Sequence, residues 1–202
     1  MVKPSPRRLD ASRRRQQILD QALAVFARFG CAGTGTRQLA AAAGVTEPIL
    51  YRHFAGKDAL FAAVLAMVAA RLETALAAVL QPYGEVRDRL QALAAALPKL
   101  LADHEDELRV LCGAAASHAD AAQAAAARRA LSGIGAVLTR AFTGAGLRRG
   151  VGAETAAFFL LEVGLGSALL RPVGVRAVLR PGFGARVVDL MTTALLPPAR
   201  RG

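Results

Sequence analysis

Apolar residues recur every three or four positions through most of this 202-residue chain, which is the spacing of one face of a helix. The first stripe predicts a helix that Ser12 caps, that runs to about Phe29 and that stops at Gly30. Strands are not evident, so the pattern predicts an all-α protein. The side chains of this first helix that we expect in the core are Ile18, Ala22, Val25, Phe26 and Phe29.

Residues 34–54 predict two short helices joined by a tight turn, which is the arrangement of a helix-turn-helix. Gly44 is expected to end the first helix in a left-handed conformation, and Thr46 is expected to cap the second. Leu50 and Phe54 lie four residues apart and should be buried. The side chains left outside suit a DNA groove better than water alone: Glu47, Pro48, Ile49, Tyr51, Arg52 and His53.

A long helix is predicted from Lys57 to about Leu80, and it would connect the helix-turn-helix to a second helical domain. Further helices are predicted over about 85–102, from Asp103 to near His118, and over about 119–142, 153–170 and 184–196. The helix over 153–170 is apolar nearly all round, so it must be covered on several sides. The pattern predicts a disordered basic arm over 1–11, a DNA-binding domain over 12–57 and a helical domain over 58–202.

Charge sharpens the picture of the first third of the chain. The net charge is +11, and residues 1–60 carry ten basic and four acidic side chains. A basic excess of this kind indicates a polyanionic partner such as DNA, and the arginines at 7–8 and 13–15 are expected to attract phosphates. An arginine-rich composition explains the excess in the rest of the chain equally well.

Several classes of function are not supported by the sequence. The N-terminus lacks the apolar core of a signal peptide, and no run of about 18 charge-free apolar residues is present, so we expect a cytoplasmic protein. The three histidines and two cysteines have no metal-ligand spacing, and no Gly-x-Ser-x-Gly turn occurs. We therefore expect no metal, no cofactor and no enzymatic activity.

Residues 30–60 resemble the DNA-binding domain of the TetR-type (tetracycline repressor) transcriptional regulators. The chain departs from that pattern at Gly35 and Gly56, where Ser or Thr is usual. The matching positions are Gly30, Thr34, Arg37, Leu39-Ala40, Ala43-Gly44-Val45, Leu50-Tyr51-Arg52-His53-Phe54, Lys57 and Leu60.

The resemblance implies a role for each exposed residue of the motif. Thr36 and Arg37 would lie at the start of the first motif helix, where the Arg37 guanidinium can bind a guanine edge. Glu47 would accept a hydrogen bond from cytosine. The remaining implied contacts are Pro48 and Ile49 with thymine methyl groups, Tyr51, His53 and Lys57 with phosphates, and Arg52 with either a base or a phosphate.

The resemblance also implies a homodimeric regulator, most often a repressor, that a small-molecule ligand releases from a near-palindromic operator. The helices over about 153–196 look similar to the family's dimer interface, although both could instead be core helices of a monomer. Glu162 would be either a ligand anchor or an interface hydrogen-bonder. The residues expected to line the ligand site are Met67, Leu111, Cys112, Phe142, Phe158 and Glu162.

A different class of function fits the same helices. The chain would then be a helical protein that binds or sequesters small molecules, with a vestigial helix-turn-helix. Arg37, Tyr51, Lys57 and the exposed Pro48-Ile49 pair argue against this alternative, because a protein that had lost DNA binding would have no use for them.

Overall fold

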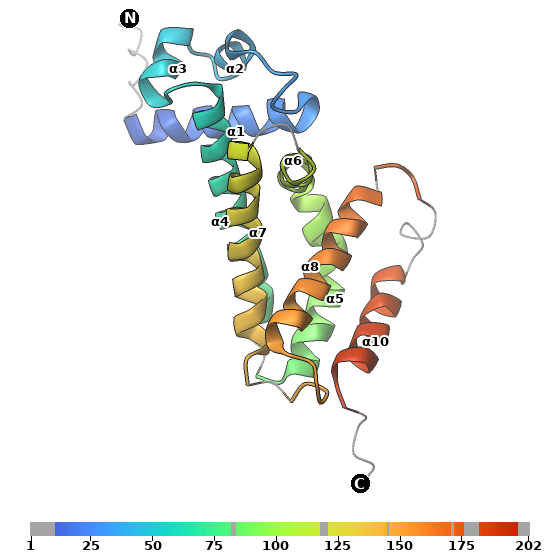
Figure 1. Cartoon of the computed structure of the whole chain (residues 1–202). Helices are drawn as coiled ribbons and strands as arrows, with labels where there is room; N and C mark the ends of the chain where they lie inside the picture. The colour runs from blue at the N-terminus through green and yellow to red at the C-terminus, as the bar shows by residue number, and fades with distance from the viewer. Residues whose placement is uncertain are drawn as a thin grey trace, which may run out of the picture.

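The computed structural model describes residues 11–81, 84–117, 121–144, 146–170, 172–175 and 182–197, and its regular structure there is entirely α-helical. This confirms the all-α prediction. Arg7 and Arg8 of the predicted basic arm lie outside the described residues. Three helices form one end of the molecule (Figure 1): α1 (Ala11–Phe29), α2 (Thr36–Ala42) and α3 (Glu47–His53).

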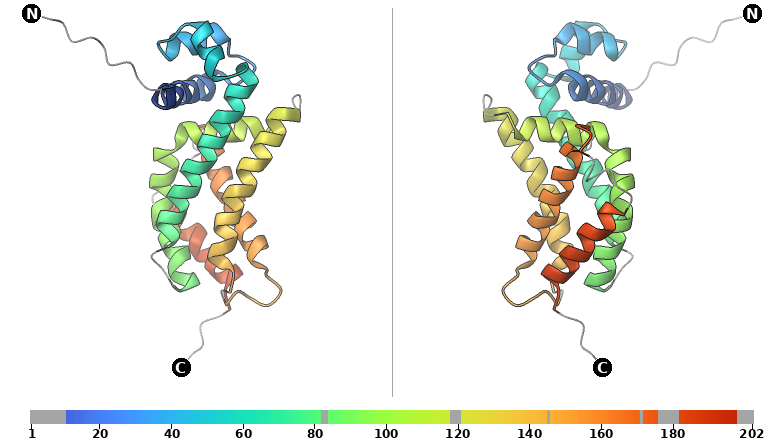
Figure 2. Two further views of the ribbon diagram at one scale, coloured as in Figure 1. Left: turned by 90° about the vertical axis from the view of Figure 1, so that its left-hand side faces the viewer. Right: turned by 90° about the vertical axis from the view of Figure 1, so that its right-hand side faces the viewer.

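The other helices form a bundle that extends away from this end, and α4 runs from one part into the other (Figures 1 and 2). Within the bundle α4 packs along α7, α7 packs along α8, and α10 packs along α5. The bundle helices are α4 (Lys57–Leu80), α5 (Val86–Asp103), α6 (Glu105–Ala115), α7 (Ala121–Phe142), α8 (Ala153–Leu170) and α10 (Phe183–Leu195).

The predicted helix boundaries hold to within a few residues, with two local corrections. Ser12 does not cap α1, because the helix already includes Ala11. Asp103 is the last residue of α5 and does not begin the next helix, whose N-cap is His104. Phe29 was expected in the core, but it is 45% exposed, and the Arg28 guanidinium lies 5.1 Å from its ring centroid.

Two apolar clusters form the interior, and the first does not stop at the end of the helix-turn-helix. It joins α1, α2 and α3 to the N-terminal part of α4, from Leu60 to Leu72, and to α6 and α7. At this junction the rings of Phe26 and Phe61 meet edge to face, with centroids 4.9 Å apart. The second cluster lies at the far end of the bundle and joins α4, α5, α7, α8 and α10. Helix α4 therefore contributes to both clusters.

Helices α4 and α8 are long and apolar enough to cross a membrane if length and composition alone are considered. The same test is passed by core helices of proteins that never enter a membrane, so it is weak evidence. In this fold α4 packs against α1, α5, α6 and α7, and α8 packs against α6 and α7. Part of their apolar surface is therefore used within the bundle.

The turn between α2 and α3 depends on Gly44, whose φ of 63° lies in the left-handed region. An L side chain there costs about 1–2 kcal/mol, so we expect Gly44→Ala to lower the free energy of unfolding by about 1 kcal/mol. Gly84→Ala is the control, because that glycine lies outside the left-handed region and nothing lies within 4 Å of an added Cβ. Urea denaturation measures both, and equal losses would show that the Gly44 conformation is not the cause.

Candidate DNA-binding site

Burial on one side holds the two helices of the motif together. Leu39, Leu50 and Phe54 are buried as the sequence predicts, with exposures of 1%, 0% and 5%. The Val45 amide donates to the Ala40 carbonyl at 3.0 Å across the turn. Neither Gly35 nor Thr46 makes a side-chain cap, although each occupies the N-cap position of its helix. The helices are therefore fixed by packing and by the turn, and their outer side is not used for packing.

The nine side chains predicted to contact DNA differ in their exposure. Arg37, Pro48, Tyr51 and Arg52 are exposed. Tyr51, at 49% exposure, is a large ring that the fold leaves in water. The partly buried members of the set are Thr36, Glu47, Ile49, His53 and Lys57.

A hydrogen bond that the sequence did not predict joins the first turns of α2 and α3. The Thr36 hydroxyl donates to Glu47 Oε2 at 2.8 Å. A hydrogen bond to a carboxylate is stronger than one between neutral groups. It orients Glu47 and leaves the other carboxylate oxygen for a partner outside the protein.

Lys57 is held by the protein at the start of α4. Its Nζ donates to the Cys31 carbonyl at 2.9 Å, in the connection between α1 and α2. The Thr34 hydroxyl, in the same connection, donates to the Gly30 carbonyl at 2.6 Å. An ammonium group has three N–H donors, so the bond to Cys31 uses only one of those of Lys57. The residue therefore fixes the start of α4 as well as presenting a positive charge.

Helix α1 supports the motif through side chains that sequence reasoning did not assign to this task. Gln17 Nε2 donates to the Ala43 carbonyl at 3.1 Å, and Arg14 Nη1 donates to Gln17 Oε1 at 2.9 Å. The Arg15 guanidinium lies 4.7 Å from the centroid of the Phe54 ring. Arg14 and Arg15 were expected to attract phosphates, and their other contacts are visible only once α1 lies against the motif.

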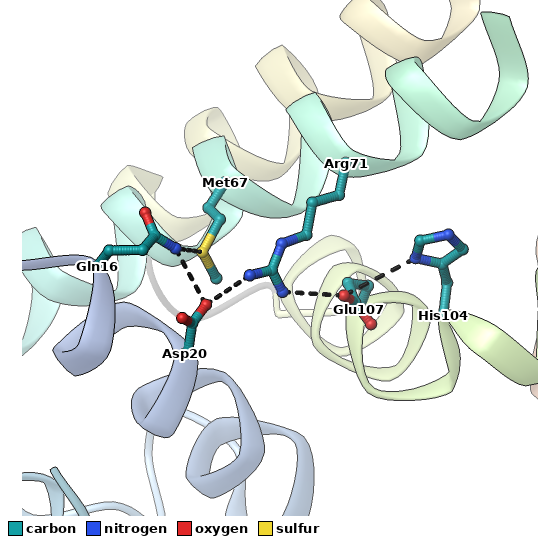
Figure 3. Close-up of polar contacts among 6 residues, drawn as sticks. All are labelled: Gln16, Asp20, Met67, Arg71, His104 and Glu107. Carbon is teal, nitrogen blue, oxygen red and sulfur yellow. Dashed lines mark hydrogen bonds and ion pairs between the residues drawn. The ribbon is translucent and has the colours of Figure 1, made fainter. Parts of the chain in front are cut away.

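A chain of polar side chains connects this end of the molecule to the bundle (Figure 3). On α4, Arg71 donates to Asp20 Oδ1 of α1 at 2.5 Å and to Glu107 Oε1 of α6 at 3.1 Å. Gln16 of α1 extends this network, because its Nε2 donates to Asp20 Oδ1 at 3.0 Å, one helical turn away. One guanidinium therefore binds carboxylates from both parts of the protein.

Glu107 is the most buried carboxylate of this chain of contacts, with a side chain only 10% exposed. His104 Nδ1 lies 3.8 Å from Glu107 Oε1, and it is buried without a hydrogen-bond partner among the described residues. Arg71 is thus the main neutralising group for Glu107. Removing a buried carboxylate's partner is costly, because the charge then stays out of water without compensation.

The six residues predicted to line a ligand site do not meet in one cavity. Leu111 lines a small apolar cavity of the bundle, and Cys112 lines a groove beside α6 that adjoins this cavity at Leu101 and Leu108. Met67 lies next to Gln16, whose Nε2 is 3.1 Å from the sulfur. Phe142 is fully packed in the second apolar cluster. The six residues thus lie at several places in the bundle, and their part in ligand binding stays a prediction.

Two of the six predicted residues, Phe158 and Glu162, lie on α8, and the register of this helix leaves both at the surface. Phe158 and Glu162 lie four residues apart on one face of the helix and are both exposed. The Phe158 ring packs instead over Gly135, where an added Cβ would lie 2.9 Å from the ring. The inward face of α8 is made by Ala156, Leu160 and Gly164. A helix that is apolar nearly all round gives no sequence signal of which face is inside.

Titratable groups give no indication of catalysis or metal binding in the part of the chain that the structure describes. Burial raises the pKa of the Cys112 thiol, so the group stays protonated and is a poor nucleophile. The described His, Cys, Asp and Glu side chains form no group of three that could hold a metal ion.

Comparison with known proteins identifies the first part of the chain. The family model of bacterial regulatory proteins of the tetR family matches residues 18–64. The chain is 36% identical over 85 residues to the transcriptional activator FasR of Mycolicibacterium smegmatis, and 42% identical over 55 residues to the regulator AcrR of Shigella flexneri. These matches cover 42% and 27% of this chain, and they span only 39% and 26% of the relatives' lengths.

The fold is shared over nearly the whole chain with solved structures. SmeT, the repressor of a multidrug efflux pump of Stenotrophomonas maltophilia, is 25% identical with a TM-score of 0.67. That match covers 92% of this chain and 91% of SmeT. A complex of SmeT with triclosan gives a TM-score of 0.73 at 22% identity and covers 93% of each chain.

The matched residues contain the whole of α2, α3 and the Gly44 turn, together with the parts of α1 and α4 that pack on them. The tetR family is one of regulators and not of enzymes, which agrees with the expectation that this chain has no enzymatic activity. Residues 18–64 of the chain thus carry the DNA-binding segment of the tetR family of bacterial regulatory proteins, with its helix-turn-helix formed by α2 and α3.

Proposed function

We propose that this protein is a cytoplasmic transcriptional repressor that binds a near-palindromic operator as a homodimer and is released by a small-molecule effector. The observation that carries the proposal is the outer side of α2 and α3. It presents Arg37, Tyr51 and Arg52 to solvent, within a segment that matches the tetR family model. A helix that leaves such side chains unpacked suits the DNA major groove.

The roles proposed for individual residues follow from exposure and chemistry. Arg37 is exposed near the start of α2, so its planar guanidinium can donate two hydrogen bonds to a guanine edge. Pro48 and Ile49 offer apolar contacts to thymine methyl groups. Arg52 would reach a base or a phosphate. The proposed phosphate contacts are Tyr51, His53 and Lys57.

Glu47 and Thr36 act together in this proposal. The Thr36 hydroxyl holds one carboxylate oxygen of Glu47, which leaves the second oxygen to accept from a cytosine amino group. The pairing places the acidic side chain before DNA arrives, so less side-chain entropy is lost on binding.

The second part of the proposal is dimerisation, and it is supported by exposed apolar side chains on α8 and α10. Leu169 is 55% exposed and Leu190 is 70% exposed, and Phe159 and Leu170 are exposed on the same pair of helices. Large exposed side chains gathered on neighbouring elements mark an interaction surface. A second copy of the chain would cover them and set the spacing of two helix-turn-helix units. Leu165, in contrast, lines the internal cavity and is a poor probe of an interface.

The third part of the proposal is a response to a ligand, and it is supported by the way α4 is held. Arg71 binds Asp20 of the DNA-binding end and Glu107 of the bundle at once. A ligand changes operator affinity only if it binds one arrangement of α4 better than the other. A tenfold change requires about 1.4 kcal/mol of such preference. The triclosan complex shows that SmeT, a protein of the same fold, binds a small molecule.

The competing function, a small-molecule binding protein with a vestigial helix-turn-helix, is disfavoured by the support that the motif receives. Gln17, Lys57 and Thr36 each make a hydrogen bond that fixes one part of the motif. A gel-shift experiment with the protein's own upstream DNA separates the two functions. A repressor gives a salt-sensitive, sequence-dependent complex, and a sequestering protein gives none.

Arg37 and Lys57 should contribute differently to DNA binding. Arg37→Ala should cost about 1–3 kcal/mol per half-site on the operator and less on unrelated DNA, because a base contact is lost. Lys57→Met should weaken binding to all sequences and reduce the salt slope by about one. Salt titrations on operator and scrambled duplexes measure both. Equal losses on the two duplexes for Arg37→Ala would make that residue a phosphate contact only.

Dimerisation should fail when charge is placed on the exposed apolar surface. In the dimer, Leu169→Arg combined with Leu190→Arg would bury unpaired charges, which costs several kcal/mol. Light scattering should then report monomers at concentrations where the unmodified protein is dimeric. Phe29→Arg is the control, because Phe29 is exposed to a similar degree but lies on α1. A dimer that survives both leucine changes would place the interface elsewhere.

Arg71 and Glu107 should be energetically coupled. Arg71→Met keeps the apolar stem but leaves buried Glu107 unpaired, and it should lower the free energy of unfolding by about 1–3 kcal/mol. In a Glu107→Leu background the same change should cost at least about 0.5 kcal/mol less. Urea denaturation of the single and double variants gives this coupling energy.

The control for this cycle is Arg109→Met, because Arg109 pairs with exposed Glu105 within α6 itself. Removing an exposed pair of that kind should change the free energy of unfolding by less than about 0.5 kcal/mol. If the Arg71 and Glu107 changes are simply additive, Arg71 does not link α4 to α6.

A further inference from the structure

A small cavity, partly open to solvent, lies in the bundle where α4, α5, α6, α7 and α8 meet. Its volume is about 90 Å³, and its walls consist of twelve leucines, Ile134, Ala75 and Gly164. These walls contain no charged, hydroxyl, amide or aromatic side chain. The side chains of these walls offer water no hydrogen-bond partner. The cavity therefore accepts hydrocarbon and rejects polar groups.

The shape of the cavity restricts the hydrocarbon further. On α5 its lining extends from Leu93 to Leu101, which is about 12 Å along a helix at a rise of 1.5 Å per residue. So small a volume spread over that length makes a narrow space. An apolar cavity of about 150 Å³ is known to hold benzene, a flat ring. A narrower and longer cavity without aromatic walls fits an unbranched alkyl chain better than a ring system.

A larger groove adjoins this cavity at the surface. Leu101 and Leu108 line both spaces, and the groove has a volume of about 550 Å³. Its polar side chains include Glu105 and Arg109, which bind each other at 2.5 Å. Because each of these charges is already paired within the protein, the groove suits an uncharged polar group better than an ionic one.

We propose that the effector of this regulator is an unbranched aliphatic molecule whose chain fills the internal cavity and whose uncharged polar end lies in the groove beside Glu105 and Arg109. The proposal rests on the ligand response proposed above and names the chemical class of the ligand.

The position of the cavity also gives the ligand a route to the DNA-binding end. Leu72 of α4 lines the cavity and follows Arg71 directly in the chain. Leu108 of α6 does the same and follows Glu107. A ligand whose alkyl chain widens the cavity must therefore move Leu72 and Leu108, the apolar side chains next to Arg71 and Glu107. Close-packed interiors transmit such displacements, because there is little free volume to absorb them.

Binding of the straight-chain alcohols hexanol, octanol and decanol to the full chain, measured by calorimetry, tests the proposal. Each added methylene that enters the cavity should lower the Kd by about fourfold. Naphthylethanol, which carries an aromatic ring system on a similar polar end, should bind at least tenfold more weakly than decanol. Equal or tighter binding of the aromatic alcohol, or a Kd that does not change with chain length, would overturn the proposal.

Two glycines of α8 provide a matched pair of variants. Nothing lies within 4 Å of an added Cβ at either Gly164 or Gly166, and only Gly164 is among the residues that line this cavity. Gly164→Leu should fill the cavity and raise the Kd for decanol at least tenfold. Gly166→Leu should leave that Kd within about twofold of the unmodified protein. Both changes replace a glycine by a better helix former, which favours folding. If both variants bind decanol equally well, the chain does not enter this cavity.

A gel shift with the operator, repeated with and without decanol, separates this proposal from the broader one. Binding of alcohols without any change in operator affinity would support the ligand class and contradict the proposed response. Failure of every straight-chain alcohol to bind, while another compound releases the operator, would overturn the ligand class and leave the inducible function standing.

Discussion

The structure depends on one constraint, which is that a single helix belongs to two apolar cores. Near its start α4 places Phe61 against Phe26 of α1, and near its end it contributes Leu80 to the far cluster of the bundle. Leu76 packs against both clusters. Because interiors are close-packed, α4 cannot shift at one end without repacking at the other. The helix-turn-helix is therefore mechanically joined to the bundle.

Arg71 lies at the place on α4 where this junction is polar. Dispersion contacts tolerate small sliding movements, whereas a guanidinium bound to two carboxylates requires defined distances and angles. Because Glu107 is buried, breaking its contact with Arg71 is costly. The next residue on each helix, Leu72 on α4 and Leu108 on α6, lines the proposed ligand cavity. The same short stretch of α4 thus carries the connection to α1, the connection to α6 and part of the cavity wall.

In the helix-turn-helix, packing is concentrated on one side and the other side is exposed. All of its packing is made on the side that faces α1 and α4, through Leu39, Leu50 and Phe54. Hydrogen bonds to backbone carbonyls from Gln17 and Lys57 hold its turn and its flanks. The outer side carries little of this packing, so its residues are available for the DNA contacts proposed above. This explains why side chains as large as Tyr51 are left exposed there.

Much of this arrangement could be predicted because it is local. The span Lys57–Leu80 and the Gly44 turn follow from apolar periodicity and from the conformational freedom of glycine, which depend on residues close together in the chain. The burial of Leu50 and Phe54 and the exposure of Tyr51 and Arg52 also follow from positions close together in the chain. The sequence by itself therefore determined the helices, the motif and the residues that hold it to its neighbours.

Tertiary structure alone decided the features that join distant segments. Arg71 reaches residues 51 positions before it and 36 positions after it, and no local pattern encodes such a pairing. The inward face of α8 was equally hidden, because a helix that is apolar on every side leaves its neighbours to decide which side is buried. That is why Phe158 was expected to line the ligand site and is exposed, whereas Gly164 lines the cavity. The exposure of Glu162 leaves its predicted role at an interface open.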